Sequence, residues 1–380
     1  MDQHKRYGQL DALRGLAALT VVLSHFALLA PSELLRRLPW RLFGGGREAV
    51  ILFFTLSGFV LTLQIYGTRR LTFREFVIRR ICRIYLPYLG AVAFAFVCYT
   101  LCYRGTIPWA GKWFNDVWPS TLADVSLAQH VLFVLPFETY RLDPIIWSLV
   151  YEMRISLLFM PVVFIVFSVP AWQAIGGAAS LSIAVCIYAT QTHHPLLQAS
   201  GDAEWLPTLH YLLMFVTGAV LARHRDAIAR WLRRTRGTGV ILLAGSLVLY
   251  EVAGRLAILP WAEARVYLFD WLVMLAVCGI IACAVSLPWF SRLLEIPPLS
   301  FLGKISYSLY LYHAIVLFAL IHLVGNRLGV VPSLALVAAL IVPVSHLGYV
   351  LVERPGMQLG SRLSRRFIAR TVPRKVAASD

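Results

Sequence analysis

An arginine and a histidine share one face of the first apolar segment of the chain. Arg14 and His25 stand eleven residues apart in LDALRGLAALTVVLSHF, residues 10–26. On a helix this spacing leaves the two side chains about 20° apart around the axis and roughly 16 Å apart along it. An ionisable side chain in hydrocarbon costs at least a few kcal/mol and is a functional-site candidate by default. The pair therefore predicts chemistry inside a membrane, and a structural hydrogen bond to His25 is the alternative.

Three closely spaced arginines, Arg79, Arg80 and Arg83, stand in a second stretch, FREFVIRRICRIYLPY, residues 73–88. Arg79 and Arg83 are one helical turn apart, as are Arg80 and Arg83, so such pairs meet on one face. Guanidinium groups at this spacing are suited to bidentate hydrogen bonds with the phosphates of a cofactor. Anchoring of a cytoplasmic helix end by positive charge is the alternative. The spacing alone favours the anchor.

A third stretch, WSLVYEMRIS, residues 147–156, contains a glutamate and an arginine. Glu152 and Arg154 are too close in sequence to face each other on a helix, so each needs a partner of its own. Two roles are open for Glu152. It either orients an imidazole, as the carboxylate of a catalytic dyad does, or forms a structural ion pair within the bundle.

Hydroxyl groups cluster in GKISYSLYLYHA, residues 303–314, and they either line a polar cavity or cap a helix. The candidate site residues of this stretch are Ser306, Tyr307, Ser308, Tyr310 and His313. Ser57 in FFTLSGFVL is interpreted as a small packing residue. The six cysteines lack the spacing of a metal site and are interpreted as apolar helix residues. No metal site is predicted.

Membrane helices must position these side chains. The chain is 59% hydrophobic and 14% charged, with a mean hydropathy of +0.71, which excludes a soluble globular protein. A span needs about 20 apolar residues. The sequence predicts an all-α, polytopic membrane bundle of about ten spans, near 10–30, 48–66, 86–104, 147–169, 173–190, 208–223, 238–254, 266–287, 305–324 and 333–352.

The positive charge of the chain follows this topology. The formal net charge is +16. With both termini in the cytoplasm, most of the 35 Lys and Arg residues fall on the cytoplasmic side, as the positive-inside rule requires. This distribution explains the charge without nucleic acid. It predicts a membrane domain over 1–355 and a basic cytoplasmic tail over 356–380. The exception is the first external loop, which carries Arg36, Arg37, Arg41 and Arg47.

Together, six stretches occur in an order that resembles the acyltransferase family 3 proteins, which are bacterial integral-membrane acyltransferases. The stretches are LDALRGLAALTVVLSHF, ILFFTLSGFVL, FVIRRICRIYLPY, WSLVYE, GKISYSLYLYHA and ERP. After Glu152 the chain reads MRISLLF, where many relatives have a second acidic residue followed by QFY. This departure concerns the substrate class more than the reaction type.

The resemblance implies an enzyme of the bacterial inner membrane. Such an enzyme takes an acyl group, usually acetyl, from a cytoplasmic acyl-CoA. It transfers this group to a hydroxyl of a cell-envelope carbohydrate or glycolipid, such as O-antigen or exopolysaccharide. In this family the pair matching Arg14 and His25 is treated as essential, and the pair matching Arg80 and Arg83 is linked with the coenzyme.

A mechanism follows as a hypothesis. Coenzyme A phosphates bind Arg80 and Arg83, with Arg79 beside them, and Arg14 holds the same cofactor. The pantetheine arm passes Ala17 and Ala18 toward His25. Neutral His25 then removes the proton of the acceptor hydroxyl, and Glu152 or a Ser or Tyr hydroxyl fixes its tautomer. The residues predicted to contact substrate are Trp147, Ser148, Ser306, Tyr307 and His313.

A transporter or flippase of a small anionic or glycolipid substrate is the rival function, because buried ionisable residues serve such proteins equally well. The sequence shows no internal repeat and no paired broken helices, which many transporters have. A structural scaffold does not explain an arginine and a histidine on one helix face.

Overall fold

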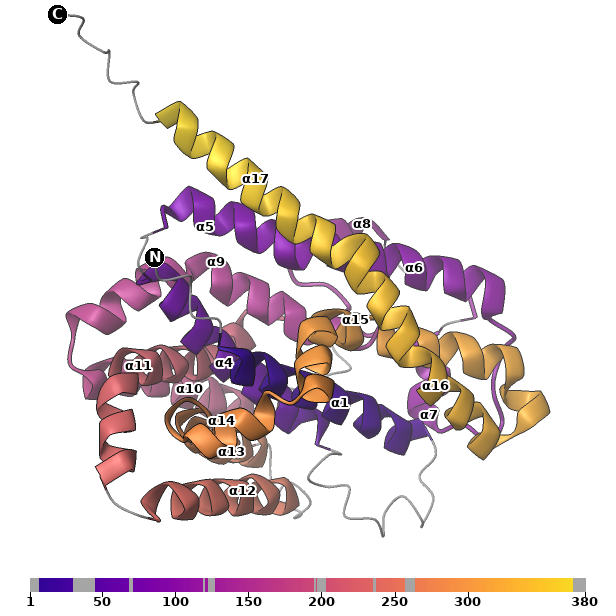
Figure 1. The fold of residues 1–380 in the computed structure, drawn as a ribbon. Coiled ribbons are helices and arrows are strands. Elements are labelled where there is room, and N and C mark those ends of the chain that lie inside the picture. The colour runs from indigo at the N-terminus through magenta and orange to yellow at the C-terminus, as the bar shows by residue number, and fades with distance from the viewer. Residues whose placement is uncertain are drawn as a thin grey trace, which may run out of the picture.

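The structure is a computed structural model of the chain. It describes residues 7–29, 45–67, 71–118, 120–121, 127–194, 196, 203–234, 237–256 and 264–371. Within these ranges the chain forms helices and loops and contains no β-strand (Figure 1). The all-α prediction is therefore confirmed.

Nine helical segments of the described chain are long and apolar enough to cross a membrane. They are α1 (Gly8–Leu29), α4 (Gly46–Ile65), α5 to α6 (Phe73–Cys102), α9 (Ile146–Ser168), α10 (Ala171–Thr192), α11 (Leu206–Arg234), α13 (Ala264–Ser286), α15 (Pro297–Leu328) and α16 to α17 (Val330–Arg366). The remaining predicted span, 238–254, lies on α12 (Thr238–Leu256), whose apolar part Thr238–Ala253 is shorter. Every predicted span thus lies on a helix of a multi-pass membrane bundle.

The helices α1, α4 and α15 form the centre of the bundle (Figure 1). Two glycines let α1 and α15 approach closely. A Cβ atom at Gly15 would lie 2.5 Å from the backbone nitrogen of Gly303, and one at Gly303 would collide with the carbonyl of Asp11. Small residues permit such backbone contact between membrane helices. The crossing point of α1 and α15 is therefore set by backbone atoms, which do not adapt as side chains do.

Two π-helical turns interrupt the helices on either side of α15. The first, η1 (Ile81–Tyr85), joins α5 (Phe73–Arg80) to α6 (Leu86–Cys102). The second, η3 (Tyr349–Glu353), joins α16 (Val330–Gly348) to α17 (Arg354–Thr371). A proline, Pro87 or Pro355, follows each turn by two residues and removes a backbone donor, which distorts the preceding turn. Such turns often occur at functional sites.

The described residues 103–118 and 127–145, which join α6 to α9, form a segment that we call the outer cap; it contacts the end of α1 through Gly111 and the start of α6 through His130. It contains the short helices α7 (Lys112–Val117) and α8 (Leu127–Val131). Trp118 Nε1 donates to the carbonyl of Leu142 at 3.1 Å, which ties its two halves together. From the sequence, this segment is only the connection between the predicted spans 86–104 and 147–169.

Arg154 joins both the outer cap and the segment before α11 to the bundle. From α9 its guanidinium donates to the carbonyls of Val134, Glu204 and Ala203 at 2.6 to 2.7 Å. Its carbon Cζ also lies 4.2 Å from the centre of the Trp205 ring. The prediction that Arg154 has partners of its own is confirmed. Its role is structural, because it holds separate segments of the chain together.

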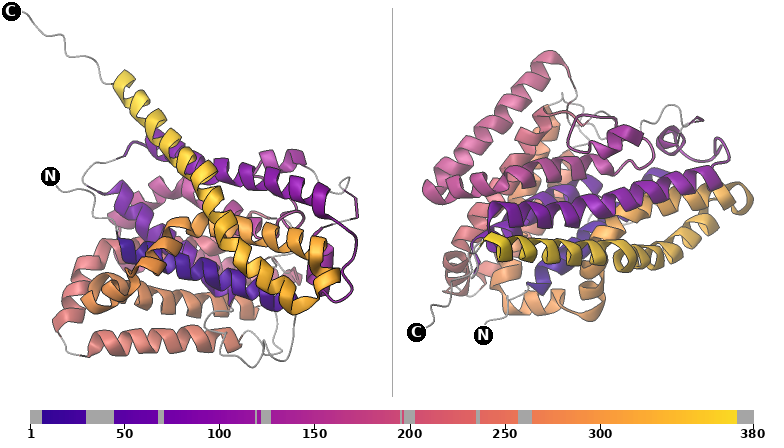
Figure 2. Two further views of the ribbon diagram at one scale, coloured as in Figure 1. Left: turned by 45° about the vertical axis from the view of Figure 1, so that its right-hand side comes forward. Right: turned by 90° about the horizontal axis from the view of Figure 1, so that it is seen from above.

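The chain continues as helix beyond the predicted membrane domain. The start of α1 and the end of α17 lie toward the same end of the bundle, as an even number of crossings requires (Figure 1). Along its length α17 lies beside α5 (Figure 2). Buried Gly356, Gly360 and Ser364 face the turn around Cys82, so the contact is close. Arg36, Arg37, Arg41 and residues 372–380 lie outside the described residues.

Candidate active site

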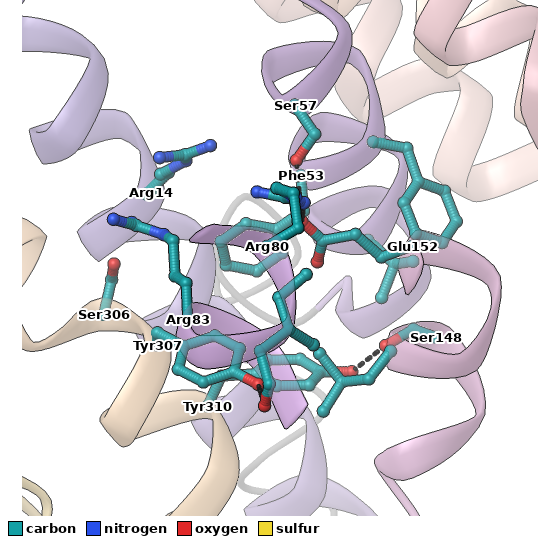
Figure 3. A pocket seen from close by; sticks show the side chains of 14 residues that line it. Arg14, Phe53, Ser57, Arg80, Arg83, Ser148, Glu152, Ser306, Tyr307 and Tyr310 are labelled. Carbon is teal, nitrogen blue, oxygen red and sulfur yellow. Dashed lines mark hydrogen bonds and ion pairs between the residues drawn. The ribbon is translucent and has the colours of Figure 1, made fainter. Parts of the chain in front are cut away.

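A pocket opens between α1, α4, α5, η1, α9 and α15 and encloses about 590 Å³, including the part open to solvent. It extends from Arg14, near the start of α1, to Ser148, near the start of α9. Six helical elements thus bring side chains to one space inside the bundle (Figure 3). Of the predicted site residues, the pocket is lined by Arg14, Arg80, Arg83, Ser148, Glu152, Ser306 and Tyr307.

A buried ion pair forms one wall of the pocket. Arg80 Nη2 donates to Glu152 Oε1 at 3.0 Å and to Ser156 Oγ at 2.7 Å. Ser57 Oγ donates to the same oxygen of Glu152 at 3.1 Å. The side chains of Arg80 and Glu152 are only 7% and 16% exposed, so water screens the pair weakly. This pair joins α5 to α9.

These contacts bear on two predictions from the sequence. Of the two roles left open for Glu152, the structure shows the ion pair, because Glu152 bonds to Arg80 and Ser57, and the hydrogen-bond partner of His25 is His313. Ser57 is also more than a packing residue, because its hydroxyl binds the carboxylate and lines the pocket. A hydroxyl within an apolar helix needs a polar partner. This requirement is the feature of the sequence that could have indicated a hydrogen bond from Ser57.

The opposite wall carries two guanidinium groups without an acidic partner. Figure 3 shows Arg14 and Arg83 on the same side of the pocket, away from Arg80 and Glu152. Among the described residues neither arginine has a carboxylate within ion-pair distance, and the one hydrogen bond of Arg83 is to Met357 Sδ at 3.2 Å. Two adjacent cations in a partly enclosed space attract an anion.

Arg79 lies away from this wall. Its Nε donates to Ser364 Oγ of α17 at 3.1 Å, and it does not line the pocket. Its predicted place beside Arg80 and Arg83 is therefore not found, although the three are close in sequence. The wider π-helical turn that begins at Ile81 changes the angular spacing along this helix, which the ideal spacing of the prediction did not include.

Hydroxyl groups of α9 and α15 line the far end of the pocket. Ser148 Oγ and Tyr310 Oη lie 2.7 Å apart, as the dashed line in Figure 3 marks. Tyr310 Oη also donates to the carbonyl of Ile145 at 3.1 Å, and Tyr307 Oη donates to that of Ile84 at 2.8 Å. Trp147 does not line the pocket, because its ring packs toward Tyr151 and Tyr211.

Two histidines pair beyond Tyr310. His25 Nδ1 and His313 Nε2 are 2.8 Å apart, and the two ring planes are inclined by only 22°. On its other nitrogen, Nδ1, His313 faces the carbonyls of Tyr310 at 2.6 Å and of Leu309 at 3.1 Å. The ring of Trp113, from the outer cap, stacks on His25 at a centroid distance of 5.1 Å. Sequence reasoning missed Trp113 and named His313 only as a substrate contact.

Tyr310 stands between the pocket and the histidine pair. It lines the pocket, and its ring centroid lies 6.0 Å from that of His313, one helical turn further along α15. The predicted passage along Ala17 and Ala18 is not where the cavity runs. Both alanines are buried, and neither lines it. The pocket instead follows the faces of α4, α9 and α15.

A second buried ionic network lies outside the pocket. Arg47 donates from Nε and Nη2 to both oxygens of Asp270, at 2.7 and 2.6 Å. The same carboxylate lies 2.9 Å from His210 Nε2, and His210 Nδ1 lies 2.7 Å from Ser182 Oγ. This network joins α4, α10, α11 and α13. It explains Arg47, which the sequence assigned to an exceptional positive loop.

A buried carboxyl group marks the junction of the outer cap and α9. Asp143 is 1% exposed, and neither side-chain oxygen has a hydrogen-bond partner among the described atoms. Burial raises the pKa of this carboxyl well above its usual value, so it holds its proton at higher pH than an exposed aspartate. The preceding residue, Leu142, has φ 70°, a strained conformation for leucine.

Separating the Arg80–Glu152 pair is expected to destabilise the protein. Removing one partner of a buried pair leaves an uncompensated charge and costs about 3–5 kcal/mol. Arg80→Met and Glu152→Gln should each lower the thermal stability of the purified protein, and the double variant should lose less than the sum. Arg83→Met is the matched control and should have a small effect, because Arg83 forms no ion pair with the described residues and its one hydrogen bond is to Met357. Additive losses in the double variant would contradict the pairing.

No group of three or more His, Cys, Asp or Glu side chains placed to hold a metal ion occurs among the described residues. The acyltransferase 3 family, described as an acyltransferase domain, matches residues 7–350. Comparison with curated proteins and with solved structures gave no match.

Proposed function

Because the chain belongs to the acyltransferase 3 family over residues 7–350, we propose that it transfers an acyl group from an acyl-CoA to a hydroxyl of a cell-envelope carbohydrate or glycolipid. Acetyl is the proposed acyl group, and the bacterial inner membrane is the proposed location. The observation that carries the proposal is the pairing of two features. Two guanidinium groups that have no carboxylate within ion-pair distance among the described residues face a pocket, and this pocket ends one helical turn from two hydrogen-bonded histidines.

The donor is assigned to the wall with Arg14 and Arg83. Coenzyme A carries several phosphate groups, and arginine binds phosphate through charge-assisted, often bidentate hydrogen bonds. Ser306 borders the same wall (Figure 3). Arg80 contributes indirectly, because its guanidinium is bonded to Glu152 and Ser156. The acyl-thioester end then reaches Ser148 and Tyr310.

The reaction needs one proton transfer and one acyl transfer. Neutral His25 removes the proton from the acceptor hydroxyl as the hydroxyl oxygen attacks the thioester carbonyl. The new carbon–oxygen bond forms, the carbon–sulfur bond breaks, and the coenzyme leaves as a thiolate that takes up the proton. Tyr310 lies between the pocket and His313, so its side chain must shift for the thioester to reach His25.

The acceptor is assigned to the side of the outer cap. His25 lies near the end of α1 and stacks on Trp113 of α7, so the base lies where the cap meets the bundle. An envelope carbohydrate would approach from this side. The coenzyme would bind from the opposite, cytoplasmic side, to which we also assign α17 and the basic segment 356–380.

Purified protein in proteoliposomes tests this function directly. With acetyl-CoA and an envelope glycan, free thiol should appear at a rate that depends on both the acceptor and His25. Mass spectrometry of envelope glycans should show acylated sugars in cells with the gene, and these should be missing from cells without it. Uptake of the glycan into the vesicles without consumption of thioester would instead identify a transporter.

A further inference from the structure

We propose that His313 is a positioning residue that sets the tautomer of His25, leaving Nε2 of His25 as the proton acceptor. The chemical role rests on the proposed function, but the assignment of protons rests only on the contacts of the two rings. In this proposal the imidazole of His313 takes the place of the carboxylate that was expected beside His25.

The protons on His313 follow from its partners. Its Nδ1 lies 2.6 Å from the carbonyl oxygen of Tyr310 and 3.1 Å from that of Leu309. A carbonyl oxygen only accepts hydrogen bonds, so Nδ1 must carry a proton. A neutral imidazole has one N–H group, and therefore Nε2 of neutral His313 is an acceptor. The helix backbone of α15 thus fixes this tautomer without any side chain.

The tautomer of His25 follows in turn. Nε2 of His313 lies 2.8 Å from Nδ1 of His25. Because His313 accepts there, His25 must donate, so neutral His25 carries its proton on Nδ1. The lone pair is then on Nε2, the nitrogen that points away from His313. In a histidine base the tautomer is commonly set by the hydrogen bond at the other nitrogen.

The ring of His25 is also held in orientation. Trp113 lies nearly parallel to it, with an interplanar angle of 9°. The ring centroids of His25 and His313 are 5.1 Å apart with an inclination of 22°, as expected of nearly coplanar rings joined edge to edge. The imidazole is therefore restrained along one edge and on one face. Its Nε2 edge makes no hydrogen bond with the described residues.

This arrangement suits a general base. When Nε2 takes the proton of the acceptor hydroxyl, Nδ1–H keeps donating to His313, so no hydrogen bond has to be exchanged. The imidazolium that forms is stabilised by the lone pair of His313, whose own Nδ1–H stays on the two carbonyls. The proton then passes from Nε2 of His25 to the departing thiolate. Every proton in the step is accounted for without a carboxylate.

Two substitutions at His313 separate positioning from packing. His313→Leu keeps an apolar volume but offers no acceptor to His25, and kcat should fall about 10²-fold or more with a nearly unchanged KM for acetyl-CoA. His313→Gln supplies a carbonyl acceptor near the position of Nε2 and should restore kcat to within about tenfold of the original enzyme. A merely structural role would not predict this rescue.

His322 provides the matched control. It is buried on the same helix, nine residues further along, and its ring nitrogens have no hydrogen-bond partner among the described residues. His322→Leu and His322→Gln therefore remove a similar ring from α15 without touching His25. Both should leave the KM for acetyl-CoA and the kcat within about threefold of the original values.

Nitrogen NMR of ¹⁵N-histidine-labelled protein reads the tautomer without any substrate. Signals lost in His25→Ala identify the His25 ring, and its unprotonated nitrogen should be Nε2. In His313→Leu this preference should weaken or reverse. An unprotonated Nδ1 on His25 in the original protein, or full kcat in His313→Leu, would overturn the proposal. If the protein shows no acyl transfer with any donor, the proposed function fails while the tautomer assignment is still decided.

Discussion

Replacing His25 with alanine is expected to remove most of the acyl-transfer activity while the protein stays inserted and folded. General-base catalysis contributes about 10²- to 10⁴-fold, so kcat should fall by a factor in that range. Alanine is the best helix former, and His25 is half-buried near the end of α1, so the helix should tolerate the change. Thiol release from acetyl-CoA, normalised to folded protein, measures the effect.

Ser24→Ala is the matched control for this experiment. Ser24 precedes His25 on α1, and its hydroxyl only donates to the carbonyl of Val21 at 2.7 Å. It should leave both transfer and the KM for acetyl-CoA close to their original values. If His25→Ala keeps full transfer, His25 is not the base, and the hydrogen bond to His313 is then structural.

Removing the two guanidinium groups of the donor wall should weaken acyl-CoA binding more than it slows the chemistry. Hydrogen bonds to charged groups contribute about 1.5–3 kcal/mol each. Arg14→Ala and Arg83→Ala should therefore each raise the KM for acetyl-CoA by about 10- to 150-fold. Contacts with phosphate are made in both the ground state and the transition state, so kcat should change less. Steady-state kinetics over a range of acetyl-CoA concentrations separates the two.

The chain offers a control within the same helical segment. Arg79→Ala removes an arginine four residues before Arg83, but Arg79 binds Ser364 and lies outside the pocket. The KM of the Arg79→Ala variant for acetyl-CoA should stay near the original value. Arg83→Lys should recover part of the affinity, because lysine keeps the charge and loses the bidentate fork. An unchanged KM in the Arg14→Ala/Arg83→Ala double variant would reduce both residues to topological anchors.

The helices were predictable because hydrocarbon imposes a simple rule on the sequence. A spanning segment must be long, apolar and internally hydrogen-bonded, and each predicted span lies on a helix. The outer cap was not predictable in this way. Its two short helices and the Trp118–Leu142 hydrogen bond depend on tertiary contacts that leave no periodic pattern.

The site was predictable by residue type but not by partnership. Arg14, Glu152 and His313 were singled out because polar groups inside a membrane need a reason. Their partners lie far away in sequence. Glu152 bonds to Arg80 across 72 positions, and His25 bonds to His313 across 288 positions. Helix spacing relates residues within one helix, so it could not tell that a second histidine, and neither Glu152 nor a hydroxyl group, would reach His25.

The crossing of α1 and α15 determines where His25 lies relative to His313. Gly15 and Gly303 touch near one end of α1, and His25 lies ten residues further along, a distance of about 15 Å. Tilting α1 by about 4° around this glycine contact would move His25 by about 1 Å. A displacement of about this size can lower the reaction rate roughly 10²-fold. One methyl group added at Gly15 would force such a tilt. The alignment of the two imidazoles thus depends on a backbone contact between two glycines, which have no functional side chain.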